Sequence, residues 1–141
     1  MWNVLWPVLL VVGANTLYNV CAKSTPAGAN AFASLSVTYF LASVLSVVLY
    51  YLTGNQKNLL AEFSKVNWTS AALALAIIGL EFGYINLYRV GWKVSVGSLV
   101  ANISLACVLL VVGLLFYKEA VSLRQMVGML VCAVGLFLIT K

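Results

Sequence analysis

The sequence predicts an all-α integral membrane protein, a single bundle of five transmembrane helices over residues 1–141. Of these residues, 64% are hydrophobic and 8% are charged, whereas a soluble domain carries about 25% charged residues. The apolar residues form five runs, each near the roughly 20 residues that a helix needs to cross the hydrocarbon core. The alternating pattern of β-barrel strands is absent from these runs. The length suits one compact unit.

The first two expected spans cover residues 2–22 and 31–52. A break of Ser, Thr, Pro, Ala and Gly at residues 24–28 separates them, because proline and glycine end helices. The first run is too long for a signal peptide, has no basic segment before it and contains Asn15 and Asn19. We therefore expect a retained membrane span.

The other three expected spans cover residues 68–90, 94–117 and 123–140. The longest connection, residues 53–67, contains an apolar segment with one acid at residues 58–63. Such a segment is typical of a short helix at the membrane surface.

Polar side chains recur at helical spacing in the first four expected spans, although they are costly to bury in lipid without partners. We expect these four spans to converge on a polar cavity and the fifth to lie at the periphery. The alternative is that hydroxyls bond to carbonyls of their own helix and asparagines join neighbouring helices. The second span carries Ser36, Tyr39, Ser43 and Ser46. The candidate substrate or coupling residues are Asn15, Tyr18, Asn19, Glu81, Tyr84, Tyr88, Ser98 and Asn102.

Glu81 is the acidic residue near the middle of the third expected span. A charge at that depth costs at least about 2.5–3.5 kcal/mol, so an acid within a membrane span indicates a functional site. A carboxyl that binds and releases protons suits coupling or cation binding. The alternative is a protonated structural carboxyl that is hydrogen-bonded to a neighbouring helix.

The fifth span has small residues instead of a polar face. Gly128, Cys132 and Gly135 form a flat face that suits close contact between helices or copies of the chain.

The residue content argues against several function classes. The chain has no histidine, and its three cysteines lie singly in apolar runs, so we expect no metal site, no cofactor and no enzymatic activity. The eight basic residues are scattered between apolar runs, which indicates membrane-flanking charge and not a nucleic-acid interface.

The segment 115–140 closely resembles the end of an EamA-like repeat in the drug/metabolite transporter superfamily. There, a Glu at a helix junction is followed nine residues later by a Gly and then by another Gly in an apolar tail, as with Glu119, Gly128 and Gly135. The first span fits as well, with Gly-Ala-Asn at residues 13–15 leading to Lys23 at its end.

This resemblance implies a transporter of small metabolites or drugs in a bacterial or archaeal cytoplasmic membrane. Typical members carry two five-helix repeats of inverted topology. The single repeat here implies a half-size member that works as an antiparallel homodimer, by alternating access to a site near the midplane. A non-transporting subunit of a heteromeric complex, or a partner that handles lipid head groups, is the alternative.

The small multidrug resistance family offers a more distant comparison. Its members carry a Glu eight residues before the lysine that ends the first helix, and here that position is Asn15. Proton exchange of that kind would need its acid from elsewhere, and Glu81 is the candidate.

The basic residues are balanced between the two sides of the membrane. With five spans, four lie on each side. Because an excess of Lys and Arg on the cytoplasmic side sets orientation, we expect insertion in both orientations, a dual topology. The two sets are Lys57, Lys65, Lys118 and Arg124 on one side, and Lys23, Arg89, Lys93 and Lys141 on the other.

Overall fold

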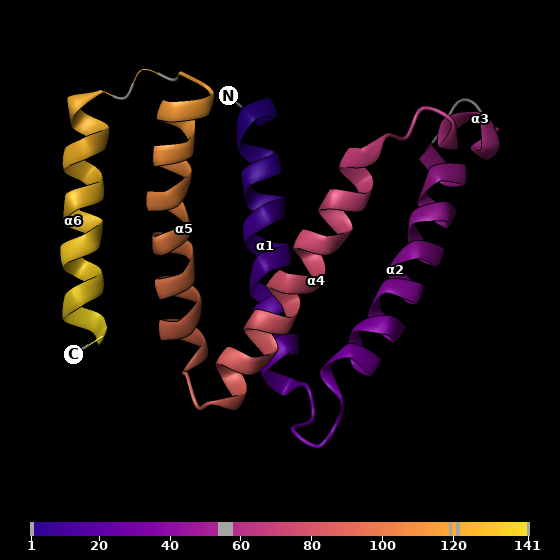
Figure 1. Ribbon diagram of the computed structural model, residues 1–141, viewed down its shortest axis with the longest axis horizontal. Helices are drawn as coiled ribbons and strands as arrows, with labels where there is room; N and C mark the ends of the chain where they lie inside the picture. The colour runs from indigo at the N-terminus through magenta and orange to yellow at the C-terminus, as the bar shows by residue number, and fades with distance from the viewer. Residues whose placement is uncertain (1, 54–57, 119, 121, 141) are drawn as a thin grey trace. The chain divides into compact units, whose positions relative to one another are not determined.

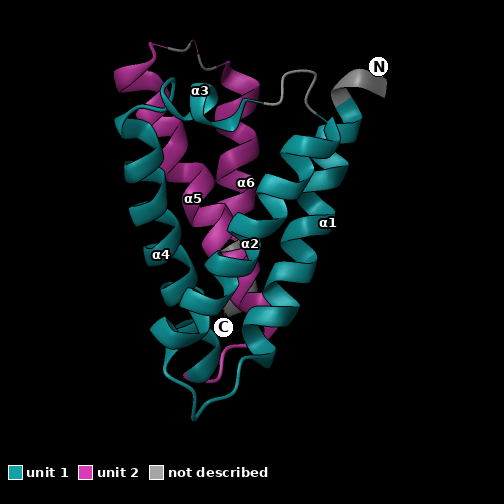
Figure 2. Ribbon diagram, turned by 90° about the vertical axis from the view of Figure 1, so that its right-hand side faces the viewer, with its two compact units in different colours: residues 1–89 teal, residues 90–141 magenta. Residues whose placement is uncertain are grey.

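The computed structural model describes residues 2–53, 58–118, 120 and 122–140, and these residues form helices and connecting turns without a strand (Figure 1). The prediction of an all-helical fold is confirmed. The chain divides into two compact units, Met1–Arg89 and Val90–Lys141, drawn in teal and magenta in Figure 2.

The first unit contains three long helices and one short helix. Helices α1 (Trp2–Ser24) and α2 (Ala31–Thr53) precede the five-residue helix α3 (Leu59–Phe63), and α4 (Trp68–Arg89) follows. Helix α4 packs against both α1 and α2 (Figure 1). Through α4, residues of the other two long helices therefore come together in one place.

The buried core of the first unit lies where the end of α1, the start of α2 and the end of α4 meet. Ala31 and Leu35 of α2 pack with Ile85 of α4, and each of the three is 4% exposed. Asn19 of α1 and Tyr88 of α4 are buried as well. We call this end of the unit, which carries the α1–α2 connection, the closed end.

Asparagine side chains cap the starts of three helices in the first unit, with Asn58 at α3 and two others at α2 and α4. Asn30 Oδ1 accepts hydrogen bonds from the backbone amides of Phe32 and Ala33, at 2.9 and 3.3 Å. Asn67 Oδ1 accepts from the Thr69 amide at 3.0 Å. Each side chain satisfies amides that have no partner within the first turn, which fixes where α2 and α4 begin.

The second unit is a pair of helices, α5 (Val94–Phe116) and α6 (Leu123–Thr140), which pack against each other. A reciprocal capping box starts α6. The Ser122 amide donates to Gln125 Oε1 at 2.8 Å, and the Gln125 amide donates to Ser122 Oγ at 3.3 Å. Glu119, which carried part of the resemblance to EamA-like repeats, lies outside the described residues.

Large apolar side chains cover the outside of both units. Phe40 is 70% exposed and Leu115 is 71% exposed, with many others at similar values. In water such a surface would aggregate, whereas the hydrocarbon core of a bilayer solvates it. Among the described residues, α1, α2, α4 and α5 are long and apolar enough to cross a membrane. The chain is an integral membrane protein.

Helix α6 is shorter than the other long helices. Its 18 residues rise about 27 Å, a little less than the roughly 30 Å hydrocarbon core. Within its described residues the apolar stretch is Leu123–Gly135. Five membrane crossings therefore stay a prediction. The five long helices start at the expected residues and end within two residues of the expected ends.

Candidate functional site

A chain of hydrogen bonds joins α4 to α1 at the closed end. The Tyr88 hydroxyl donates to Asn19 Oδ1, and Asn19 Nδ2 donates to the backbone and side-chain oxygens of Asn15 at 2.7 and 2.9 Å. Tyr88 is 3% exposed and Asn19 is 4% exposed. A buried amide and a buried hydroxyl are tolerated here because they satisfy each other.

Two basic residues hold the closed end together through backbone carbonyls. Lys23 Nζ donates to the Tyr88 carbonyl at 3.2 Å and lies 5.8 Å from the centre of the Tyr88 ring. Arg89 Nη2 donates to the carbonyls of Pro26 and Ala29 at 3.1 and 2.6 Å. Arg89 therefore ties the end of α4 to the α1–α2 connection.

Three tyrosine rings form a wall between α1 and α4. Tyr18 and Tyr84 meet edge to face, with ring centres 5.4 Å apart and an angle of 88° between the planes. The ring centres of Tyr84 and Tyr88 are 6.0 Å apart. Edge-to-face contacts of this kind are favourable and orient the rings.

A cavity of about 120 Å³ lies between α1, α2 and α4 beside this wall. The Glu81 carboxyl, from the middle of α4, is its charged group. The Tyr39 hydroxyl of α2 approaches this carboxyl but forms no hydrogen bond of good geometry with any described residue. The lining residues are Tyr18, Cys21, Ala22, Thr38, Glu81 and Ile85.

Within the described residues, no lysine or arginine forms an ion pair with Glu81. The ion pair found there joins Lys65 to Glu62. The Tyr18 hydroxyl, which also borders the cavity, is buried without a hydrogen-bond partner in the same part of the chain. The Glu81 carboxyl and the hydroxyls of Tyr18 and Tyr39 thus lie near one another between three helices, and neither hydroxyl forms a hydrogen bond of good geometry with a described residue.

A comparison with protein-family models relates this chain to known proteins. The model of the EamA-like transporter family matches residues 2–141. The chain belongs to the EamA-like transporter family. No curated protein and no solved structure matches it. The EamA-like family is a family of transporters, so the chain is assigned to transport across membranes and not to an enzyme class.

Six of the eight residues predicted to serve substrate or coupling in this EamA-like chain lie in the first unit. They are Asn15, Tyr18 and Asn19 on α1, and Glu81, Tyr84 and Tyr88 on α4.

The other two predicted residues, Ser98 and Asn102, lie on α5 in the second unit. Ser98 Oγ donates to the Val94 carbonyl at 2.8 Å, and Asn102 Nδ2 donates to the Ser98 carbonyl at 2.7 Å. Both side chains bond to their own helix, and their part in a transport site stays a prediction.

Some of the hydroxyls predicted to form a polar stripe on the second span bond to their own helix instead, which is the alternative stated for them. Ser36 Oγ and Ser46 Oγ donate to the carbonyls of Phe32 and Ala42, four residues earlier, at 2.9 and 2.8 Å. These hydroxyls satisfy themselves on their own helix. Tyr39, from the same stripe, reaches Glu81 instead.

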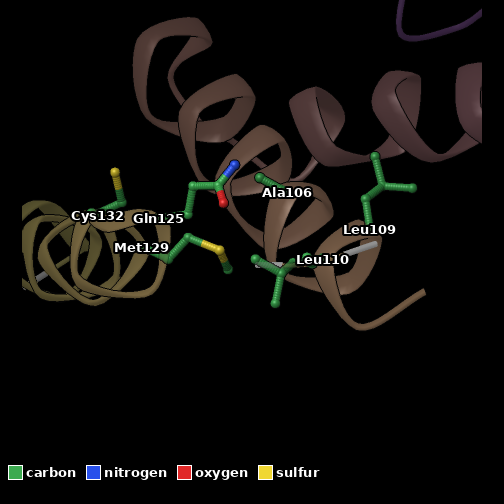
Figure 3. A pocket seen from close by; sticks show the side chains of 8 residues that line it. Ala106, Leu109, Leu110, Gln125, Met129 and Cys132 are labelled. Carbon is green, nitrogen blue, oxygen red and sulfur yellow. The ribbon is translucent and has the colours of Figure 1, made fainter. Parts of the chain in front are cut away.

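A larger groove of about 520 Å³ lies between α5 and α6 (Figure 3). Its size alone would favour it as a binding site, but the described residues that line it carry no charge, and their polar groups are the Gln125 amide and the Cys132 thiol. The Glu81 cavity is therefore the better candidate for a polar solute. The groove is lined by Ala106, Leu109, Leu110, Ala120, Gln125, Gly128, Met129 and Cys132.

The small-residue face of α6 borders this groove and is open. Apart from their chain neighbours and the nearby backbone of α6 itself, no described atom lies within 4 Å of where a Cβ would stand on Gly128 or Gly135. Cys132 is exposed. The use of this face in packing between copies stays a prediction.

Sequence reasoning did not assign Tyr39, Thr38 or Arg89 to the site. Tyr39 stood in a recognised polar stripe, and its aromatic ring among serines was the signal that set it apart. The sequence pattern places Arg89 only among the membrane-flanking charges. Its backbone partners follow from the path of the α1–α2 connection, which no spacing in the sequence reveals.

Proposed function

We propose that this EamA-like chain transports a small metabolite or drug, that it works as a homodimer, and that the Glu81 cavity is its substrate or coupling site. The observation that carries the proposal is the Glu81 carboxyl in a cavity bounded by three helices of spanning length, without a basic partner in the described residues. A carboxyl at this depth is costly unless it serves function.

The residues around the carboxyl have separate roles in this proposal. Glu81 binds substrate or the coupling proton, and Tyr18 and Tyr84 form the aromatic wall against which a solute lies. Asn19 and Tyr88 hold α1 and α4 in register. On the same proposal, Asn15 continues their hydrogen-bond chain along α1, and Ser98 and Asn102 are candidate substrate residues on α5.

The dimer is proposed to be antiparallel, with five crossings in each copy and one inverted relative to the other. The balanced basic residues support insertion in both orientations, and a pair of inverted copies would place the two sites near a shared midplane. The open face of Gly128, Cys132 and Gly135 supports close packing between copies. Alternating access would then exchange the two sides, in a bacterial or archaeal cytoplasmic membrane.

Flux measurements in liposomes test the proposal. The purified chain is first screened with metabolites and drugs for ligands that raise its thermal unfolding temperature, and the hits are then measured for uptake. Glu81→Gln should retain folding and dimerisation but lose most of the uptake.

Glu62→Gln is the matched control, because Glu62 pairs with Lys65 on the exposed helix α3. It should transport normally. Absence of flux for every stabilising ligand, in protein that is folded and dimeric, would contradict transport and favour a non-transporting subunit.

A further inference from the structure

The Glu81 cavity is lined by one carboxyl and the Tyr18 hydroxyl, and the Tyr39 hydroxyl approaches the same carboxyl. This combination restricts the ligand more than the family does. The carboxyl accepts hydrogen bonds, and a tyrosine oxygen both accepts and donates. In the part of the chain that the structure describes, no lysine or arginine lines the cavity. The charge complementary to this site therefore has to come from the ligand.

We infer that the Glu81 cavity binds a primary or secondary ammonium group, whose N–H bonds are shared by the Glu81 carboxylate and the hydroxyl oxygens of Tyr18 and Tyr39. This inference rests on the proposed function and names the chemical class of its ligand.

The hydroxyls favour an ammonium group that carries N–H bonds. The Tyr18 hydroxyl is buried and has no hydrogen-bond partner among the described residues. The Tyr39 hydroxyl is buried beside the Glu81 carboxyl, without a hydrogen bond of good geometry to any described residue. Both hydroxyls interact electrostatically with Glu81. Buried polar groups are nearly always satisfied in proteins. An ammonium held by Glu81 would donate to these oxygens, whereas a quaternary ammonium has no N–H to donate.

The aromatic wall favours a cation as well. The Tyr18 and Tyr84 rings meet edge to face beside the carboxyl, and aromatic faces attract ammonium groups within about 6 Å. An anionic solute would meet the Glu81 carboxylate and the negative faces of the rings. The cavity thus discriminates by the sign of charge.

The size of the cavity limits what enters it. Its volume of about 120 Å³ is below the roughly 300–1,000 Å³ of sites that enclose drug-sized ligands. A small amine, or the amine end of a longer molecule, suits this space.

Binding of three small probes to the protein in phosphatidylcholine nanodiscs tests the inference by ligand-detected NMR. The probes are n-propylammonium, tetramethylammonium and propionate, which differ in N–H bonds and in charge, and empty nanodiscs give the background. We expect n-propylammonium to bind most tightly, tetramethylammonium more weakly and propionate not at all. Propionate binding as tight as that of n-propylammonium would overturn the inference.

Variants locate the binding. Glu81→Gln should weaken n-propylammonium binding by about tenfold or more, because a hydrogen bond to a charged group is lost. Tyr18→Phe and Tyr39→Phe should each weaken it by about twofold to tenfold and leave tetramethylammonium unchanged. Tyr51→Phe is the control, because Tyr51 is 46% exposed on α2 and does not line the cavity.

Unchanged binding in both Tyr18→Phe and Tyr39→Phe would overturn the inference, even if Glu81→Gln fails to fold. Uptake assays separate it from the proposed function. Ammonium binding without flux of any solute would contradict transport and leave the ammonium site standing. Flux of another solute, without ammonium binding, would leave transport standing and remove the ammonium site.

Discussion

The Tyr88 hydroxyl donates its hydrogen bond to Asn19 Oδ1, and this bond joins α4 to α1 at the closed end of the first unit. Tyr88 is 3% exposed, so its hydroxyl is committed to the protein. Tyr84, one turn earlier, is only partly buried, and its ring contacts those of Tyr18 and Tyr88.

The bond between Tyr88 and Asn19 should contribute measurable stability. A double-mutant cycle of Tyr88→Phe and Asn19→Ala should give a coupling energy between about 0.6 and about 1.7 kcal/mol, which are the mean and the maximum for hydrogen bonds between membrane helices. Unfolding in mixed micelles by SDS measures it. Combining Tyr51→Phe with Asn19→Ala is the control and should be additive. Additivity of the first pair would mean that the bond adds nothing to stability.

Removal of the carboxyl at position 81 should remove the pH dependence of transport. If Glu81 carries the coupling proton, wild-type uptake in liposomes should change between about pH 6 and about pH 8, and Glu81→Gln should show a flat profile at reduced flux. Glu62→Gln should keep the wild-type profile. A wild-type profile in the Glu81→Gln variant would assign the carboxyl a structural role.

Cys21 reports directly on the charge of the cavity, because it is one of the lining residues. With Cys107 and Cys132 replaced by alanine, a cationic methanethiosulfonate reagent should modify Cys21 roughly tenfold faster than an anionic one. Glu81→Gln should abolish this preference. Equal rates before that substitution would mean that the carboxyl exerts no field on the cavity. In a chain without native cysteines, Leu130→Cys, on the exposed face of α6, should stay unmodified inside lipid.

Arg89 should stabilise the closed end through the α1–α2 connection. Arg89→Gln removes its two hydrogen bonds to the carbonyls of Pro26 and Ala29. We expect a loss of about 1–3 kcal/mol in the free energy of unfolding, together with faster proteolysis of residues 25–30. Lys93→Gln removes the same charge from an exposed position and should have little effect. Equal sensitivity of the two variants would mean that the lost charge, not the carbonyl contacts, matters.

Balanced flanking charge should produce both membrane orientations. Reporters fused to the C-terminus, one active in the cytoplasm and one outside it, should show comparable activity. Two of the eight basic residues counted, Lys57 and Lys141, lie outside the described residues.

Two added lysines in one connection should trap a single orientation, and flux should return only when oppositely biased copies are expressed together. Activity of only one reporter in the unaltered chain would contradict dual topology.

The sequence by itself determined where the helices of this protein lie along the chain and that they lie in a lipid bilayer. Apolar runs of spanning length leave the bilayer as the only medium that solvates residues such as Leu10 and Phe40. Asn30, Asn67 and the pair Ser122 and Gln125 mark helix starts through bonds within one turn. Helical spacing also placed Glu81 and Tyr84 on one face, because that relation depends only on the pitch of the helix.

Only the tertiary structure decided which polar residues meet. Tyr88 pairs with Asn19 across 69 positions, Arg89 reaches the α1–α2 connection, and Tyr39 approaches Glu81 because α4 packs against both α1 and α2. Hydropathy is nearly uniform around these helices, so it does not specify which face turns toward a neighbour. Packing between helices makes that choice, and it separates a buried tyrosine that holds the bundle from one that lines a cavity.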